Sequence, residues 1–415
     1  MMMSDYYNRK KCALCQSQNI ENVINFGKTP LANSYLKKIN QKSKVYPLSL
    51  SLCKECGHLQ LNQIVNPKIM FENYSYVSGT SKVLISHFEK YAQKLINKFK
   101  LKKKDKILDI ACNDGTFLKQ FIDKGYKKVI GIEPARNLRK INKEIGIDIN
   151  SYFFNLTTSD KLKKKYKPIK IITANNVCAH IPSIDNFIRG VANILDSQSI
   201  FVFEVSYLLD VYNKMTFDTM YHEHVSYHSL KPLIFFFNKY DLEIFDFDLI
   251  KAQGGSIRIY VSKKEIMKIK KQKIDNQIKK ENNSKLFNKL TFLNYFKKLI
   301  IIKKKLKKIL YKILKNKQKI VGFGAPAKLT TFSYFFEIDK NIVSFIIDDN
   351  PLKQNTFSPG KKIPIKSYKY LKNNDWDAII IFAWNFSDSI IKKLKQDFKN
   401  KKIIVPFPIP KIINI

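Results

Sequence analysis

The stretch Lys106-Ile-Leu-Asp-Ile110 is an apolar run with a carboxylate near its end, and Ala111-Cys-Asn-Asp-Gly-Thr116 follows it as a turn. A helical pattern covers residues 117–124, and Lys128-Val-Ile-Gly-Ile-Glu133 is a second apolar run that ends in an acid. A buried strand, a turn of small residues, a helix and a second strand with a terminal acid form a nucleotide-binding βαβ unit. The carboxylate of Glu133 can accept hydrogen bonds from both ribose hydroxyls. This stretch therefore predicts an α/β domain built on a Rossmann-like sheet.

The turn itself indicates which cofactor the sheet binds. A dinucleotide fold uses G-x-G-x-x-G to bring backbone amides against a pyrophosphate, whereas this turn contains only Gly115, preceded by Asn113. Such a turn suits a cofactor that carries a ribose and a cationic amino-acid tail but no phosphate. We therefore predict S-adenosylmethionine, with Asp109 beside its positive tail and Asn113, Gly115 and Glu133 around it.

Two further loops are expected near this cofactor. The apolar strand at residues 169–173 runs into Ala174-Asn-Asn-Val-Cys-Ala-His-Ile181, which emerges at the carboxyl edge of the sheet and carries Asn175 and His180. Upstream, residues 74–81 form a polar aromatic loop that includes Tyr76. Two interpretations of this loop stay open: a lid over the cofactor, or a solvated linker.

A histidine-rich stretch follows the next strand, residues 199–204. Tyr221-His-Glu-His-Val-Ser-Tyr-His228 contains three of the six histidines of the chain, together with a carboxylate and two phenols. Loops beyond strand ends usually carry chemistry because a rigid sheet positions them. By itself the stretch is consistent with either an acid–base site or a metal site.

Two CxxC pairs near the N-terminus predict a structural zinc site. They are Cys12-Ala-Leu-Cys15 and Cys53-Lys-Glu-Cys56, with His58 two residues beyond the second pair. Two such turns supply the four thiolates of a tetrahedral zinc site, which leaves no open position for catalysis. A redox role is the alternative, but the βαβ context of a redox CxxC is missing here. His58 is an alternative ligand, but we expect it to be a surface residue.

The C-terminal quarter repeats the nucleotide-binding pattern. Ile320-Val-Gly-Phe-Gly-Ala-Pro-Ala-Lys328 matches G-x-G-x-x-A after a strand, and Phe345-Ile-Ile-Asp348 is the next strand with its terminal acid. The expected organisation is a zinc-binding module, an α/β core, a helical Lys-rich linker and a second Rossmann-like domain. Their predicted bounds are residues 1–68, 69–262, 263–319 and 320–415.

The charge of the chain is extreme but does not indicate nucleic-acid binding. The 415 residues contain 75 Lys and Arg against 34 Asp and Glu, a net charge of +41, yet arginine occurs only at positions 9, 136, 139, 189 and 258. Proteins that read DNA grooves depend on arginine for bidentate contacts. Lysine is instead spread along the whole chain. For Arg258 two interpretations are open: a phosphate contact, or a surface residue of its strand.

Membrane association is also not expected. The opening MMMSDYYNRKKC has no apolar segment typical of a secretory signal, and no run of about 18 uncharged apolar residues is present. We therefore expect a cytoplasmic protein. The basic amphipathic stretch 299–310 is consistent with a helix on a membrane surface, but we favour a solvated helix that bridges two domains.

These motifs in combination resemble the class I methyltransferases that C-methylate sugar nucleotides, the NDP-hexose C-3 methyltransferases of deoxysugar biosynthesis. The shared segments cover nearly the whole chain: two CxxC pairs, residues 109–118, 131–134, 174–181 and 221–227, and the GxGAPAK loop. One departure is Ala111-Cys112, where the family commonly has a glycine followed by a small residue. The resemblance implies an S-adenosylmethionine methyltransferase core with an N-terminal zinc module and a second Rossmann-like domain.

The resemblance also assigns roles to individual residues. It implies that Tyr221, Glu223, His224 and His180 surround the sugar, with His224 as the base that removes a proton next to a ketone. The C-terminal domain would hold the nucleoside diphosphate through Gly322, Gly324, Lys328 and Asp348.

Two other functions remain as alternatives. One is an NAD-dependent oxidoreductase that uses the C-terminal glycine loop, and the other is a basic zinc-containing nucleic-acid-binding protein. The sugar, the nucleotide, the stereochemistry of methylation and the oligomeric state stay open.

Overall fold

The computed structural model describes residues 4–72, 74, 76–251 and 254–415. The chain divides into two compact units, and each unit is assembled from three separate segments. Unit 1 comprises Met1–Glu21, Ser51–Val211 and His224–Asn288, and unit 2 comprises Asn22–Leu50, Tyr212–Glu223 and Lys289–Ile415.

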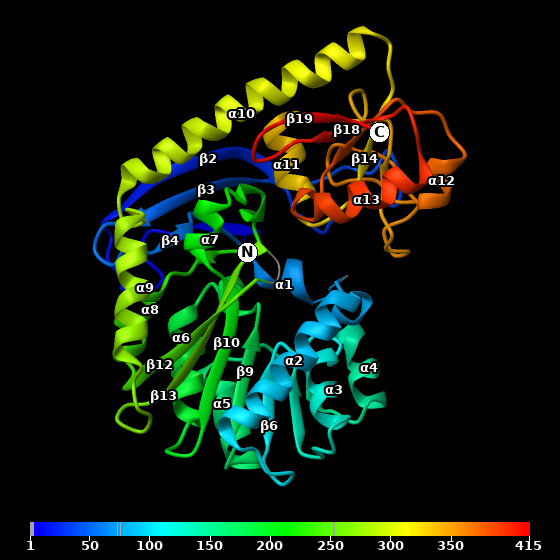
Figure 1. Ribbon diagram of the computed structural model, residues 1–415. Helices are drawn as coiled ribbons and strands as arrows, with labels where there is room; N and C mark the ends of the chain where they lie inside the picture. Colours follow the sequence, from blue (N-terminus) through cyan, green and yellow to red (C-terminus); the bar gives the residue numbers. More distant parts are fainter. Residues whose placement is uncertain (1–3, 73, 75, 252–253) are drawn as a thin grey trace. The chain divides into compact units, whose positions relative to one another are not determined.

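Unit 1 is built on a seven-stranded sheet in the order β12-β13-β10-β9-β6-β7-β8 (Figure 1). Strand β13 is antiparallel to both of its neighbours, whereas the other adjacent strands are parallel. The strands span β6 Ile107–Ile110, β7 Val129–Ile132, β8 Asp148–Asn150, β9 Ile171–Asn175, β10 Ile200–Ser206, β12 Leu242–Ile250 and β13 Ser256–Lys263. Every residue of β6 and β7 is buried, as expected for strands covered on both faces.

Helices cover both faces of this sheet (Figure 1). Helices α2 and α3 pack on each other, as do α5 and α6, and residues of α2 and α3 form one hydrophobic core with the strands. The helices span α1 Pro67–Phe71, α2 Lys82–Phe99, α3 Thr116–Ile122, α4 Arg139–Glu144, α5 Leu156–Tyr166, α6 Ile184–Ile194, α7 Leu208–Asn213, α8 Leu230–Asn238 and α9 Lys271–Asn283.

The turn between β6 and α3 requires glycine at position 115. Gly115 has a φ of +76°, a region that side chains other than glycine rarely adopt. A Cβ atom there would also lie 2.3 Å from Cδ1 of Ile147. The single glycine of the predicted cofactor turn is therefore needed for the backbone path and for close packing.

A buried ion cluster joins α2 to the sheet. The guanidinium of Arg258 donates two hydrogen bonds to Oε2 of Glu204, at 2.7 and 3.0 Å, and Nε2 of His87 lies 2.9 Å from Oε1. Arg258 is 3% exposed and stacks over the ring of Tyr91 at 3.3 Å. Both interpretations of Arg258 as a phosphate contact or a surface residue are therefore wrong: it neutralises a buried carboxylate.

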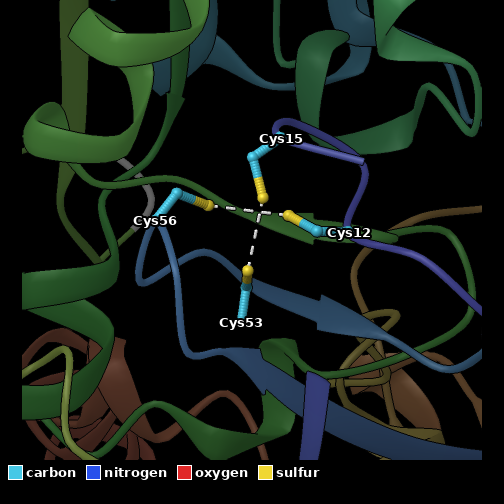
Figure 2. Close-up of side chains that lie close together, drawn as sticks. All are labelled: Cys12, Cys15, Cys53 and Cys56. Atoms are coloured by element: carbon cyan, nitrogen blue, oxygen red, sulfur yellow. Dashed lines mark hydrogen bonds between the residues drawn. The ribbon is translucent and has the colours of Figure 1, made fainter. Parts of the chain in front are cut away.

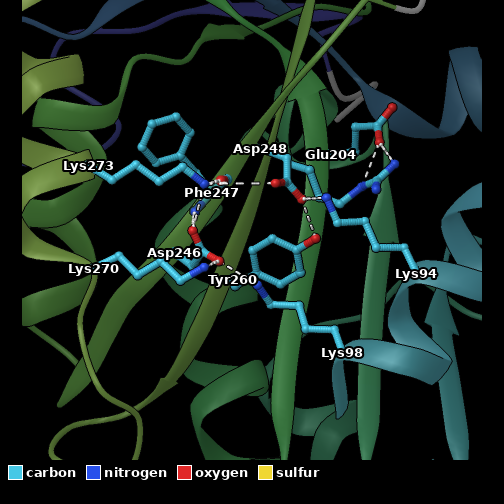
Figure 3. Close-up of polar contacts among 10 residues, drawn as sticks. Lys94, Lys98, Glu204, Asp246, Phe247, Asp248, Tyr260, Lys270 and Lys273 are labelled. Atoms are coloured by element: carbon cyan, nitrogen blue, oxygen red, sulfur yellow. Dashed lines mark hydrogen bonds and ion pairs between the residues drawn. The ribbon is translucent and has the colours of Figure 1, made fainter. Parts of the chain in front are cut away.

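A second group of charges lies along the neighbouring strand β12 (Figure 3). Asp246 contacts Lys98 of α2 and also Lys270 and Lys273, while Asp248 contacts Lys94. The hydrogen bonds from these lysines lower the pKa of Asp246 despite its burial, which opposes the shift. Part of the large lysine excess is thus used in contacts between elements of unit 1.

The N-terminal segments form small sheets. Strands β1 Tyr6–Asn8 and β5 Gln63–Val65 pair with each other, and a four-stranded sheet has the order β11-β4-β3-β2. Its strands span β2 Ile20–Pro30, β3 Val45–Cys53, β4 Leu59–Leu61 and β11 Ser226–Tyr227. Strands β2 and β3 each contain a boundary between the two units, so the chain crosses from one unit to the other inside them.

Unit 2 contains a second sheet in the order β16-β15-β14-β17-β18-β19, parallel except for β19. Its core contains Trp376 together with Val321 and Phe323 of β14 and Ile379 and Ile381 of β17. The elements span α10 Lys289–Lys315, β14 Ile320–Phe323, α11 Leu329–Phe336, β15 Ile346–Ile347, β16 Ile365–Lys366, α12 Tyr368–Lys372, β17 Ala378–Ile381, α13 Ser387–Asp397, β18 Lys402–Val405 and β19 Lys411–Asn414.

The predicted fold class is confirmed. The chain has a Rossmann-like core, a second mostly parallel sheet and N-terminal cysteine turns. The Lys-rich stretch 263–319 contains α9 and the long helix α10. Among the residues described, no helix is both long and apolar enough to cross a membrane.

Candidate functional site

The four cysteines of the two CxxC pairs converge on one point in unit 1 (Figure 2). Their sulfur atoms all lie within 4.8 Å of one another, with 3.6 Å between Cys12 and Cys56 and 3.4 Å between Cys15 and Cys53. A tetrahedral zinc ion with Zn–S bonds of about 2.3 Å holds its sulfur ligands roughly 3.8 Å apart. The spacing of the four side chains therefore fits Zn²⁺.

The pKa values of thiols in the cluster also indicate that the cluster binds a cation. A hydrogen bond from Cys56 lowers the pKa of the Cys12 thiol to about 5, whereas burial raises the pKa of Cys15 to about 12. Four adjacent thiols cannot all become thiolates unless a cation offsets their mutual repulsion. His58 is outside this set: it is fully buried, contrary to the expected surface position, and its Nε2 lies 3.3 Å from Oγ of Ser226.

Asp109 occupies the predicted cofactor edge of the sheet in unit 1. It is 2% exposed, and one carboxylate oxygen accepts hydrogen bonds from Oγ1 of Thr173 at 2.6 Å and Nδ2 of Asn175 at 3.3 Å. Burial raises its pKa to about 7, and the charge of Glu133 adds to this shift. The structure thus brings Asp109 and Asn175 into contact and places Glu133 close enough for its charge to act on Asp109.

Glu133 holds the backbone of the cofactor turn. Its Oε2 accepts the N–H of Asn113 at 2.8 Å, and its Oε1 accepts the N–H of Ala135 at 2.8 Å. Each carboxylate oxygen has two lone pairs, so both atoms keep capacity for ribose hydroxyls. The acid at the end of β7 therefore shapes the turn after β6 in addition to its predicted contact with a cofactor.

The polar aromatic loop lies against the same turn. The N–H of Ser78 donates to Oδ1 of Asn113 at 2.9 Å, and the N–H of Gly79 donates to Oδ2 of Asp114 at 2.8 Å. Nδ2 of Asn113 in turn donates to the carbonyl of Tyr76 at 3.0 Å. These bonds dock the loop on the turn and argue against a solvated linker, and its role as a lid over the cofactor stays a prediction. Asn73 and Ser75 lie outside the described residues.

His180 and His224 form a close pair in unit 1. Their ring centroids are 4.9 Å apart and the rings are perpendicular. His180 ends the short helix Cys178–His180 after β9, and the N–H of Val225 donates to the carbonyl of Ala179 at 2.8 Å. Burial lowers the pKa of His180 well below its usual value, and its neighbour His224 adds to this effect. His180 is therefore neutral near pH 7.

The boundary between two segments of the chain, one in each unit, falls within the predicted catalytic stretch, between Glu223 and His224. Tyr221 and Glu223 belong to unit 2, whereas His224 is the first residue of the last segment of unit 1. Within unit 2, Oε1 of Glu223 accepts a hydrogen bond from Nδ2 of Asn33 at 2.7 Å. The sequence offered no signal for Asn33, because 190 residues separate it from Glu223.

The other two histidines of the stretch are buried against backbone. Nε2 of His222 donates to the carbonyl of Pro47 at 3.1 Å, and Nε2 of His228 donates to the carbonyl of Cys178 at 3.2 Å. Burial lowers the pKa of both rings to about 4. Both are therefore neutral hydrogen-bond donors near pH 7.

The glycine loop of unit 2 is shaped by packing and by a carboxylate. Gly324 has a φ of +87°, and a Cβ atom at this position would lie 2.7 Å from Cβ of Ala383. A Cβ atom at Gly322 would meet the ring of Phe382. Oδ2 of Asp348 accepts the N–H of Ala325 at 2.6 Å. Asp348 therefore holds this loop in the way that Glu133 holds the turn in unit 1.

Lys328 ends this loop and is half-buried, with its Nζ atom turned away from solvent. In the described part of the chain, its Nζ is buried and has no hydrogen-bond partner, and the same is true of Oδ1 of Asp218. Burial raises the pKa of Asp218, while the charge of Lys328 and a 2.7 Å hydrogen bond from Nε1 of Trp384 oppose that shift. A buried ammonium without a hydrogen-bond partner is a candidate ligand contact.

Tyr35 and Lys353 also contact the glycine loop. The hydroxyl of Tyr35 and Nζ of Lys353 both donate to the carbonyl of Ala325, at 2.6 and 2.7 Å. The predicted site omitted Tyr35, Asp218 and Lys353. Of these three, only Lys353 lies in a recognisable stretch, the Asn350-Pro-Leu-Lys353 loop that follows the acid Asp348 and resembles the same family.

Three domain families match almost the whole chain. Residues 12–71 match a zinc-binding domain, residues 84–246 match a methyltransferase domain, and residues 251–410 match the C-methyltransferase C-terminal domain. The three matches follow one another in the order expected from the sequence motifs.

One relative matches the chain over nearly its full length. C-methyltransferase NovU from Streptomyces niveus is 25% identical over 407 residues, which is 97% of each chain. Among solved structures, a methyltransferase from Anabaena variabilis is 13% identical, with a TM-score of 0.35, over 42% of this chain and 85% of that one. A methyltransferase from Clostridium acetobutylicum is 12% identical, with a TM-score of 0.35, and the match covers 43% of this chain and 91% of that one.

Substitution of Cys53 by serine should remove zinc from the protein and destabilise the N-terminal turns, because three thiolates and a hydroxyl bind Zn²⁺ more weakly than four thiolates. Metal analysis of the purified protein should find about one zinc per wild-type chain and much less in the variant. Cys178→Ala, which removes a buried thiol outside the cluster, should keep its zinc. Full zinc content and unchanged stability in Cys53→Ser would exclude the cluster as the zinc site.

Proposed function

We propose that this chain, an S-adenosylmethionine-dependent C-methyltransferase with a zinc-binding domain, methylates a carbon atom next to the ketone of a nucleotide-linked sugar. The observation that supports this most directly is the pair of His180 and His224 in the loops beyond the sheet edge that carries Asp109. The expected location is the cytoplasm.

The histidine pair suits the first chemical step. Methylation next to a ketone requires removal of a C–H proton, and histidine, with an unperturbed pKa of about 6.5, is a suitable base near neutral pH. We assign His224 as this base. His180, which is neutral because of its burial, orients the substrate or His224 through a hydrogen bond. Tyr221 and Glu223 are proposed to bind the sugar and support the oxygen of the enolate.

The carboxyl edge of the first sheet is proposed to hold the cofactor. S-adenosylmethionine, when bound, supplies an electrophilic methyl group on a sulfonium. Asp109 would bind its cationic amino-acid portion, and Glu133 would accept the ribose hydroxyls. Tyr76 lies in the loop that docks on this turn, where it can exclude water from the reacting carbon. Cofactor contacts are thus proposed for Asp109, Asn113, Gly115, Glu133, Asn175 and Tyr76.

Unit 2 is proposed to bind the nucleoside diphosphate. The buried Nζ of Lys328 lacks a hydrogen-bond partner within the described residues, and a phosphate oxygen would supply one. Gly322 and Gly324 give the loop its path, and Asp348 fixes it. An NAD-dependent oxidoreductase is less well supported, because the domains that match this chain are a methyltransferase domain and a C-methyltransferase C-terminal domain.

Incubation with labelled S-adenosylmethionine and a panel of nucleotide-linked 4-ketosugars should give a product whose added methyl group is detected by mass spectrometry. His224→Asn should abolish this product, because asparagine cannot accept the proton, while calorimetry shows cofactor affinity near that of wild type. Retained turnover would remove His224 as the base. Absence of a product from the entire panel would contradict the proposed substrate class.

The affinity for S-adenosylmethionine should fall as the pH falls below about 7. The pKa of Asp109 is raised to about 7, so the carboxyl is neutral below that pH, whereas a cationic ligand favours its charged form. Binding must then release a proton, and the affinity should decrease by up to about tenfold per pH unit. Calorimetric titration between pH 5.5 and 8 measures this slope. Asp109→Asn should bind more weakly and show a flatter pH dependence; an unchanged slope would exclude Asp109 as the linked group.

Lys328→Ala should weaken binding of the nucleotide sugar without affecting the cofactor. Loss of a charge-assisted hydrogen bond to phosphate should raise KM for the sugar substrate by about tenfold or more. Steady-state kinetics and cofactor titration separate the two effects. Lys340→Ala, which removes an exposed lysine of the same unit, provides the control. An unchanged KM in Lys328→Ala would contradict the phosphate contact.

A further inference from the structure

Arg9 binds the two backbone segments that carry the histidine pair. Its Nη2 donates to the carbonyl of Pro182 at 2.8 Å, and its Nη1 donates to the carbonyl of Val225 at 3.4 Å. Pro182 lies two residues after His180, and Val225 directly follows His224. One planar guanidinium thus spans both loops, although 173 and 216 residues separate Arg9 from its two acceptors.

Val225 is the point at which several of these contacts meet. Its N–H donates to the carbonyl of Ala179, and its own carbonyl accepts the N–H of Leu61 at 3.0 Å in addition to Arg9. The backbone on either side of the histidine pair is therefore connected directly through Val225 and Ala179, and again through Arg9.

The same contacts lead to the zinc cluster. The N–H of Arg9 donates to the carbonyl of Asn62 at 2.7 Å, immediately after β4. Within β4, Oε1 of Gln60 accepts the N–H of Ala13 at 2.7 Å, and Gln60 pairs with Ser226 of β11. The N–H of Cys53 donates to the carbonyl of His58 at 2.9 Å. Hydrogen bonds thus join β4, and His58 just before it, to both cysteine turns. Strand β4 also pairs with β11, which lies in the segment after His224.

Position 9 has an arginine in a chain whose basic residues are nearly all lysines, and this residue type suits a contact with two acceptors. Arginine occurs at only five positions, and the buried one at 258 makes a two-pronged contact with Glu204. A guanidinium has several N–H donors in one plane, whereas an ammonium is a compact charge on a flexible stem. The planar guanidinium lets one side chain donate to two carbonyls from different loops in a fixed geometry.

We propose that Arg9 is a positioning residue that holds the loops of His180 and His224 in register and joins them to the zinc-bound turns. This inference rests on the proposed function of the histidine pair. The zinc cluster then has a role beyond folding its own turns, because it anchors β4 and the segment of Arg9 on which the acid–base pair depends. A displacement of about 1 Å in a reacting group can lower a rate about a hundredfold.

The test compares Arg9→Lys and Arg9→Ala with Arg189→Lys, a control at an exposed arginine on α6. Both Arg9 variants should lose about tenfold to a hundredfold in kcat, with zinc content and cofactor affinity within about twofold of wild type. Added guanidinium ion should restore part of kcat in Arg9→Ala, an effect that a purely structural role would not produce. Unchanged kcat, or a loss of kcat that only follows a loss of zinc, would overturn the proposal.

Hydrogen exchange gives a second readout that does not depend on activity. In Arg9→Ala, amides within residues 176–182 and 224–228 should exchange faster, while those of α5 and α6 stay as in wild type. Unchanged exchange in the two loops would refute the positioning role whatever the reaction is. Full activity of His224→Asn together with faster exchange in Arg9→Ala would instead refute the base assignment and leave the backbone role of Arg9 intact.

Discussion

Four thiols within 4.8 Å of one another are the constraint on which the N-terminal part of this protein depends. Such a cluster is stable with its thiols ionised only when a cation such as Zn²⁺ binds it, and the energy of metal binding then becomes folding energy. The turns that carry Cys12 and Cys53 are joined to β4 by backbone and side-chain hydrogen bonds. Because β4 pairs with β11, the metal site also influences the position of the segment that follows His224.

The large sheets of the two units share one local arrangement at the turn after their first strand. In each, an acid at the end of the second strand accepts an N–H from the turn that follows the first strand: Glu133 binds Asn113, and Asp348 binds Ala325. A carboxylate that accepts backbone N–H groups gives a polar turn a defined shape. The turns differ in their glycines, and in the proposed function this difference separates a phosphate-free cofactor from a phosphate-bearing substrate.

Much of the fold could be predicted from the sequence because its signals are local. The apolar runs at β6 and β7, the turn at Gly115 and the two CxxC pairs are each contained in a few neighbouring residues. Arg258 was misinterpreted, because its partner Glu204 lies 54 residues away and nothing near it in the sequence indicates a buried carboxylate. His58 was expected at the surface for a similar reason: its burial follows from packing beneath the ring of His228.

The sequence by itself determined the fold class, the four cysteines, the acids at the strand ends and the histidine-rich stretch, since these depend on residue type and spacing. The family resemblance already implied that His180 and His224 lie at one site, but only the tertiary structure decided that their rings meet at right angles, that His222 and His228 face backbone carbonyls, and that Arg9 spans two loops. The physical reason is that these contacts join segments far apart in the chain. Their geometry is set by strand pairing and core packing, which leave no periodic trace in the sequence.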